Sequence, residues 1–207
     1  MRNTDKKWQV QRKQNSFAST ILIIAIVAII GFSMTACKEP DPCADCLKIG
    51  ATGPGDGIII YHKHAGFTVT ELGTCYYLEA APDNQAQFLI WSTTNEHVTG
   101  ATGTAIGTGK ANTDAIIAAH SGDTASNNAA KAAVAYTDGG KNDWFLPSKD
   151  ELNEMYKAKN HLGISSGEFW SSSQYNYNYA WKQSFFYGNQ DFSDKYRDYG
   201  VRAIRAF

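Results

Sequence analysis

Four aromatic residues near the end of the chain, Tyr175, Tyr177, Tyr179 and Trp181, alternate with polar residues. Alternate residues of a β-strand share one face, so a strand here would carry all four rings on one side. Flat aromatic faces stack on sugar rings, and the neighbouring side-chain amides can bond sugar hydroxyls. The row is either a glycan-binding platform or the buried face of a strand. We expect Tyr177 to be exposed and Trp181 to be buried.

Two histidines could form part of a metal site. His62 and His64 lie two positions apart in a segment that predicts a strand, so their rings would face the same way. A zinc site needs further ligands, which Cys75, His97 or a distant carboxylate would have to supply. Histidines on a strand surface are the commoner case, and we expect neither a metal nor another cofactor.

Arg202 and Arg205 lie three apart in a strand-like segment and should point to opposite faces. At least one should be exposed or paired with a carboxylate such as Asp194 or Asp198. We include Arg202 among the candidate ligand-binding residues.

Motifs for enzymatic chemistry are weak. The segment 103–110 is Gly-rich but lacks the glycine spacing and the Ser or Thr after Lys110 that a phosphate-binding loop requires. The pattern Gly-x-Ser-x-Gly occurs once, at 163–167, but it follows a predicted helix and precedes a predicted strand, the reverse of the strand–turn–helix order that a nucleophile elbow requires. We therefore expect a protein that is not an enzyme, with an uncharacterised hydrolase left open.

The first 36 residues have the parts of an export signal. An apolar run, Ile21–Phe32, is followed by small residues and Cys37, as in the lipobox of bacterial lipoproteins. The run is shorter than the roughly 20 apolar residues of a spanning helix, which argues against an uncleaved anchor. The basic residues that precede it are Arg2, Lys6, Lys7, Arg12 and Lys13. We predict cleavage before Cys37, lipid on Cys37 and a place outside the cytoplasm, in the outer membrane or at the cell surface.

Residues 37–48 are polar, contain two prolines and read as a tether between lipid and domain. Three cysteines remain beyond Cys37, namely Cys43, Cys46 and Cys75. In an oxidising compartment they allow one disulfide and leave one thiol, and the pairing stays open.

The remaining chain, 49–207, predicts strands, then helices, then strands, an order typical of a single α+β domain. Ser148 and Glu151 form a capping box that predicts a helix start, and Gly163 fits its end. We expect Trp144 and Trp170 in the core. The expected strands are 58–61, 75–79, 87–91, 169–170, 180–187 and 200–207, and the other expected helices are 111–120, capped by Asn112 or Thr113, and 126–136.

Several ordered blocks of the domain resemble the DUF1566 family, also called the Lcl C-terminal domain after a Legionella collagen-like adhesin. The resemblance runs from about Ile49 to Phe207. The blocks are GPGDGI (53–58), YLEAAP (77–82), IGTGKANT (106–113), WFLPSKDEL (144–152), FWSSS (169–173) and VRAIRAF (201–207). The resemblance implies a secreted or surface domain and, in some members, an adhesin that binds polysaccharide. It also implies a mixed sheet of the C-type-lectin-like or formylglycine-generating-enzyme-like kind with two or three helices.

The sequence differs from the formylglycine-generating enzymes in one respect and from the collagen-like adhesin in another. Formylglycine-generating enzymes need reactive cysteines late in the fold, whereas Cys75 is the last cysteine here, and the collagen-like repeat of the adhesin is missing. The formal net charge is −1 although the leader is basic, which gives no general attraction for nucleic acid. We expect a membrane-anchored domain that binds glycan or an envelope or host polymer, with a structural envelope protein as the alternative.

Overall fold

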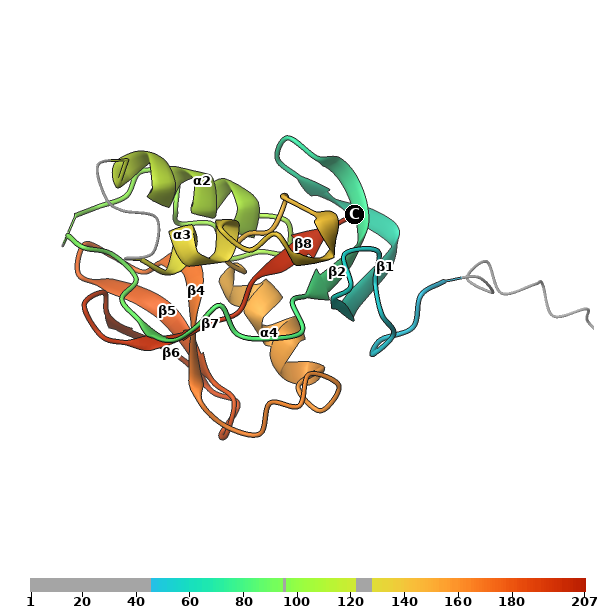
Figure 1. Ribbon diagram of the computed structural model, residues 1–207. Helices are drawn as coiled ribbons and strands as arrows, with labels where there is room; N and C mark the ends of the chain where they lie inside the picture. Colours follow the sequence, from blue (N-terminus) through green and yellow to red (C-terminus); the bar gives the residue numbers. More distant parts are fainter. Residues whose placement is uncertain (1–45, 95, 122–127) are drawn as a thin grey trace, which may run out of the picture. The chain divides into compact units, whose positions relative to one another are not determined.

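The computed structural model of the chain (Figure 1) describes residues 46–94, 96–121 and 128–207. The predicted leader 1–36, Cys37, Cys43 and most of the predicted tether lie outside the described residues. Within the described segments, no helix is long and apolar enough to cross a membrane.

Three strands form an antiparallel sheet in the order β1-β2-β8. They are β1 (Ile58–Val69), β2 (Gly73–Ala80) and β8 (Ile204–Ala206). β1 is rich in β-branched and aromatic residues, which favour the pleated backbone, and it extends well beyond the expected 58–61.

Five strands form a second sheet in the order β3-β7-β4-β5-β6. They are β3 (Ala86–Leu89), β4 (Glu168–Gln174), β5 (Tyr179–Ser184), β6 (Gln190–Asp194) and β7 (Tyr199–Val201). β7 and β4 run parallel and the other pairs antiparallel, so this sheet is mixed. The edge strand β6 was not expected from the sequence.

The segment 200–207, expected as one strand, is divided between the two sheets. β7 ends at Val201 and β8 begins at Ile204. Between them, Ala203 N donates to the side-chain oxygen of Gln85 (2.5 Å), and Arg202 donates to Pro82 O (2.5 Å). Backbone bonds flank this step, since Gln85 N donates to Val201 O and Ala81 N donates to Ala203 O (both 2.9 Å), so the chain changes sheets at Arg202.

The helices are α2 (Gly109–Ala119), α3 (Ala129–Val134) and α4 (Lys149–Lys157), with a 3-10 turn at Asp138–Gly140. Asn112 and Thr113 do not cap α2, because the helix begins earlier, after Thr108. Both side chains are buried and donate instead to backbone carbonyls, Asn112 to Gly103 (2.6 Å) and Thr113 to Gly109 (2.7 Å).

The predicted capping box at the start of α4 is confirmed. Ser148 Oγ accepts from Glu151 N, and Ser148 N donates to Glu151 Oε2 (2.7 Å). The helix ends at Lys157, so Gly163 does not follow its last turn as expected. Gly163 instead has a positive φ in the turns beyond the helix.

The core consists of two clusters, and β4 contributes to both, with Phe169 in the first and Trp170 in the second. α4 packs against both sheets and contributes Leu152 and Met155 to the first cluster. The second cluster lies beneath α2 and α3 and contains Trp144 and Trp170, which confirms their expected burial. Together these elements make a single α+β domain with three helices and mixed sheets in the described part of the chain.

Candidate functional site

The four alternating aromatic residues do not lie on one strand. β4 ends at Gln174, and the chain turns at residues 175–178 before β5 begins at Tyr179. The side-chain oxygen of Asn176 accepts from the amides of Asn178 (2.9 Å) and Tyr179 (3.0 Å), which fixes the turn. The prediction of one continuous strand face was therefore wrong.

The turn nevertheless brings three of the four rings together with Phe192 of β6. Tyr175 stacks on Phe192 with ring centroids 4.2 Å apart and contacts Trp181 edge-on at 5.3 Å. Tyr179 lies 5.5 Å from Phe192, which pairs directly with Trp181 across the sheet. We call Tyr175, Tyr179, Trp181 and Phe192 the aromatic surface.

The aromatic surface is open to solvent. Tyr175 is 48% exposed and Phe192 is 40% exposed, while Tyr179 and Trp181 are half-buried. The expected burial of Trp181 was wrong, because Trp181 lies near the N-terminal end of α4, where Lys149 places its ammonium 4.3 Å from the ring centroid. A cation over the ring face leaves the ring partly accessible while stabilising its position.

Tyr177 lies at the tip of the turn and is 61% exposed, which confirms its expected exposure. It does not join the aromatic surface. Its ring packs instead against His97, with centroids 5.7 Å apart.

A buried lysine holds the base of this turn. The Lys195 ammonium donates to Glu96 O and to Gln174 Oε1, both at 2.7 Å, and lies over the Trp91 ring. Burial lowers the pKa of Lys195 to about 8. Lys195 N also donates to Asn178 O (2.9 Å), so the lysine connects the turn to the strand that follows β5 and to the loop around residue 96.

Arg202 lies apart from the aromatic surface. It is buried, and its guanidinium donates to Asn84 Oδ1 (2.8 Å) and to Pro82 O. Burial lowers the pKa of Arg202 to about 10. The five candidate ligand-binding residues are thus divided: Tyr175, Tyr179 and Trp181 meet, while Tyr177 and Arg202 do not join them.

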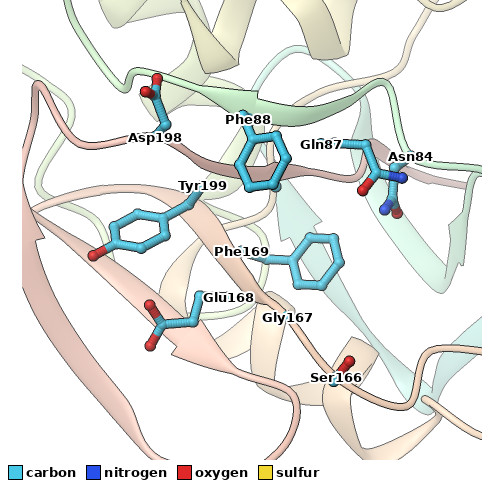
Figure 2. A pocket seen from close by; sticks show the side chains of 10 residues that line it. Asn84, Gln87, Phe88, Ser166, Gly167, Glu168, Phe169, Asp198 and Tyr199 are labelled. Atoms are coloured by element: carbon cyan, nitrogen blue, oxygen red, sulfur yellow. The ribbon is translucent and has the colours of Figure 1, made fainter.

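Arg202 lines a hollow of about 460 Å³. A neighbouring hollow of about 320 Å³ shares four of its lining residues, Asn84, Gln87, Ser166 and Phe169. Figure 2 shows the rings of Phe88, Phe169 and Tyr199 around the smaller hollow. Amides of Asn84 and Gln87 lie on one side of it, and the carboxylates of Glu168 and Asp198 lie on the other. Sequence reasoning missed Phe88, which is 76% exposed, because one apolar residue in a short strand carries no functional signal.

The histidine pair has no third metal ligand in the part of the chain that the structure describes. The rings of His62 and His64 are 6.5 Å apart, and His62 stacks on Tyr77 at 4.5 Å. Cys46, 3.8 Å from His62, is disulfide-bonded, whereas Cys75 is a buried free thiol. Cys75 is therefore the cysteine left outside the bridge.

Two fully buried carboxylates support the fold. Glu151 accepts from Gly107 N (2.8 Å) and Ser148 N, and burial raises its pKa to about 7. Glu79 forms an ion pair with Arg205 (2.8 Å), whose guanidinium also binds Asp143. Neither Glu79 nor Glu151 lines the two hollows.

The ion pair of Glu79 with Arg205 brings together three of the sequence blocks, 53–58, 77–82 and 201–207. Gly53 and Gly55 lie directly against the Glu79 carboxylate, where a Cβ would overlap it. Arg205 therefore pairs with a carboxylate as expected, but the partners are Glu79 and Asp143 instead of Asp194 or Asp198.

No curated protein has a matching sequence. The model of the Lcl C-terminal domain matches residues 79–205. This range begins at Glu79 and ends at Arg205, the two partners of the buried ion pair. Because the match covers more than half of the chain, the chain belongs to the Lcl C-terminal domain family.

Proposed function

We propose that this chain is a lipid-anchored binding domain of the bacterial envelope that recognises a glycan or another envelope or host polymer through the aromatic surface. The observation that carries the proposal is the solvent-exposed group of rings around the Tyr175–Phe192 stack. Large exposed apolar groups that are rigidly held are typical of interaction sites.

The chemistry of the aromatic surface suits a sugar ligand. The rings of Tyr175, Trp181 and Phe192 offer both flat faces and edges, and the apolar C–H faces of a sugar can stack on them. Lys149 at Trp181 adds a donor at the rim. Because the rings pack on one another before any ligand is present, little side-chain entropy is lost on binding.

The proposed location rests on the leader and on the cysteines. The apolar run and the small residues before Cys37 favour cleavage and lipidation there. A disulfide at Cys46 supports an oxidising compartment, since structural disulfides persist outside the cytoplasm. The mixed sheets and three helices are compatible with a lectin-like fold, which we include in the proposal.

A glycan array and the purified envelope polysaccharide of the producing cell would test the proposal. We expect Trp181→Ala to weaken binding by about tenfold, the loss of one good aromatic contact, while the domain stays folded. Tyr187→Ala is the matched control, because Tyr187 is an exposed aromatic residue outside the aromatic surface.

Phe88→Ala distinguishes the two regions described above. Binding that is lost with Phe88→Ala but kept with Trp181→Ala would move the ligand site to the hollow of Figure 2. A wild-type domain that binds no glycan or polymer would favour the structural envelope protein.

A further inference from the structure

The turn between β5 and β6 exposes two aromatic rings. Phe186 is 64% exposed and Tyr187 is 80% exposed, and their centroids lie 4.7 Å apart. Among the described residues no large hydrophobic side chain is more exposed than Tyr187. Neither ring belongs to the aromatic surface, so the turn is a separate apolar feature.

The backbone of this turn is firmly held. Gly188 N donates to Ser184 O (2.8 Å), and the Lys159 ammonium donates to Phe185 O (2.7 Å). Phe185 itself is fully buried. Gly188 has a φ of +84° and lies directly against the Tyr156 ring, where a side chain would not fit. The two outward rings are thus presented by a fixed backbone.

The first described residues contact the segment after α4, which also contacts the β5–β6 turn. Gly50 lies directly against the ring of His161, which follows Lys159 by two residues in the segment after α4. In Figure 1 this segment follows the labelled helix α4 and leads to β4. Through Lys159 it also contacts the β5–β6 turn. The segment therefore links the aromatic turn to the place where the N-terminal chain enters.

An exposed apolar residue and an exposed basic residue lie where the described chain begins. Ile49 is 42% exposed, and Lys48 is exposed beside it. The Lys157 side chain is 59% exposed but ion-paired with Glu154 (2.6 Å), so this pair adds no net charge and Lys48 supplies the basic group. Exposed aromatic rings together with an exposed lysine suit the interface of a bilayer, where rings lie among headgroups and lysines meet lipid phosphates.

We propose that this end of the domain rests on the membrane that carries the anchor, with Phe186 and Tyr187 inserted among the lipid headgroups. The inference rests on the proposed lipidation of Cys37. Between Cys37 and Cys46 the chain can span at most about 30 Å, so the entry point stays near the bilayer. Two rings alone would bind a membrane weakly, but a short tether raises their effective concentration at its surface.

A fluorescence experiment on the full chain, expressed and purified from the membranes of the producing cells, tests this contact. In a Cys75→Ala background, Tyr187→Cys is labelled with an environment-sensitive nitrobenzoxadiazole dye. The protein is reconstituted into vesicles of phosphatidylethanolamine and phosphatidylglycerol that contain lipids with a nitroxide near the headgroup. Asn178→Cys, at the exposed turn before β5, is the matched control.

We expect the label at 187 to shift to shorter wavelength and to lose intensity through nitroxide quenching, while the label at 178 keeps both properties. Equal behaviour of the two labels on membrane-bound protein would overturn the contact and leave the anchor intact. A chain that is not recovered with membranes would contradict lipidation, and with it the contact.

Discussion

Tyr175 and Phe192 stack face to face, with ring planes within 3° of each other, across the turn and the edge strand of the larger sheet. The stack joins the residue that leaves β4 to the middle of β6. It therefore fixes the relative positions of the other two rings of the aromatic surface, which pack against it.

Phe192→Ala should disrupt this surface without unfolding the domain. Because Phe192 is 40% exposed, we expect the free energy of unfolding to fall by about 1 kcal/mol, the value of an aromatic pair. Glycan binding should fall together with it, as measured on the array. Phe186→Ala, which removes a ring elsewhere, should leave binding unchanged.

Ser148→Ala should destabilise the domain by about 1 kcal/mol through loss of the helix cap. Ser148 Oγ also donates to Ala105 O (2.9 Å), so the substitution leaves a second backbone group without its partner. Urea unfolding measures the change, with the exposed Ser166→Ala as control. An unchanged midpoint would show that the cap contributes nothing.

Glu151 should make the domain less stable as the pH rises. Its pKa is about 7 in the folded state and 4.5 ordinarily, so the folded state binds the proton more tightly. The resulting stabilisation is complete below pH 4.5 and is lost as the pH rises through 7, by about 3 kcal/mol. Urea unfolding between pH 4.5 and 8 should show this decrease in the wild type.

The variant Glu151→Gln should lack this part of the pH dependence, because the amide does not titrate. It should also be less stable at low pH, since its NH₂ group replaces one of the oxygens that accept from Gly107 N and Ser148 N. Glu154→Gln, at a partly exposed position, should keep the wild-type slope.

Lys195 should make the domain more stable as the pH rises in the alkaline range, the opposite of the effect of Glu151. Its pKa is about 8 when folded and 10.5 ordinarily, so the unfolded state binds the proton more tightly in this range. Stability should therefore increase from pH 8 to 10.5. Lys195→Met should remove this increase, whereas Lys157→Met at an exposed site should retain it. A wild-type curve that is flat over this range would show that burial does not lower the pKa of Lys195.

Cys37→Ser should leave the precursor uncleaved and without lipid. Metabolic labelling with a fatty-acid probe, followed by separation of membranes, measures both effects. Cys75→Ser is the control, because the thiol of Cys75 is buried in the domain. Equal incorporation of the probe in both variants would contradict the lipoprotein proposal.

The sequence could predict the features that depend on residues close together in the chain. The capping box of α4 depends on four consecutive residues, and Ser148 and Glu151 behave as expected. The exposure of Tyr177 likewise follows from its polar neighbours. The turn that interrupts the aromatic row depends on Asn176, whose role as a turn residue competes with the strand pattern of the tyrosines.

Non-local contacts were beyond such reasoning. Phe192 joins the aromatic surface only because β6 pairs with β5. The sequence of one strand does not determine which other strand it pairs with. The same holds for Lys195 and Arg202, whose partners lie far away in the sequence. The block 53–58 carried the family resemblance, but only the structure shows the Glu79 carboxylate against which Gly53 and Gly55 lie.

The division of the last strands between the two sheets affects when the domain can fold. Neither sheet has all its strands until residues 199–206 have been made, because β7 lies inside the larger sheet and β8 completes the smaller one. Pairings of such distant segments form late and slowly. Under the proposed export, neither sheet could be completed before the last residues of the chain had been made, which would favour crossing the membrane before folding.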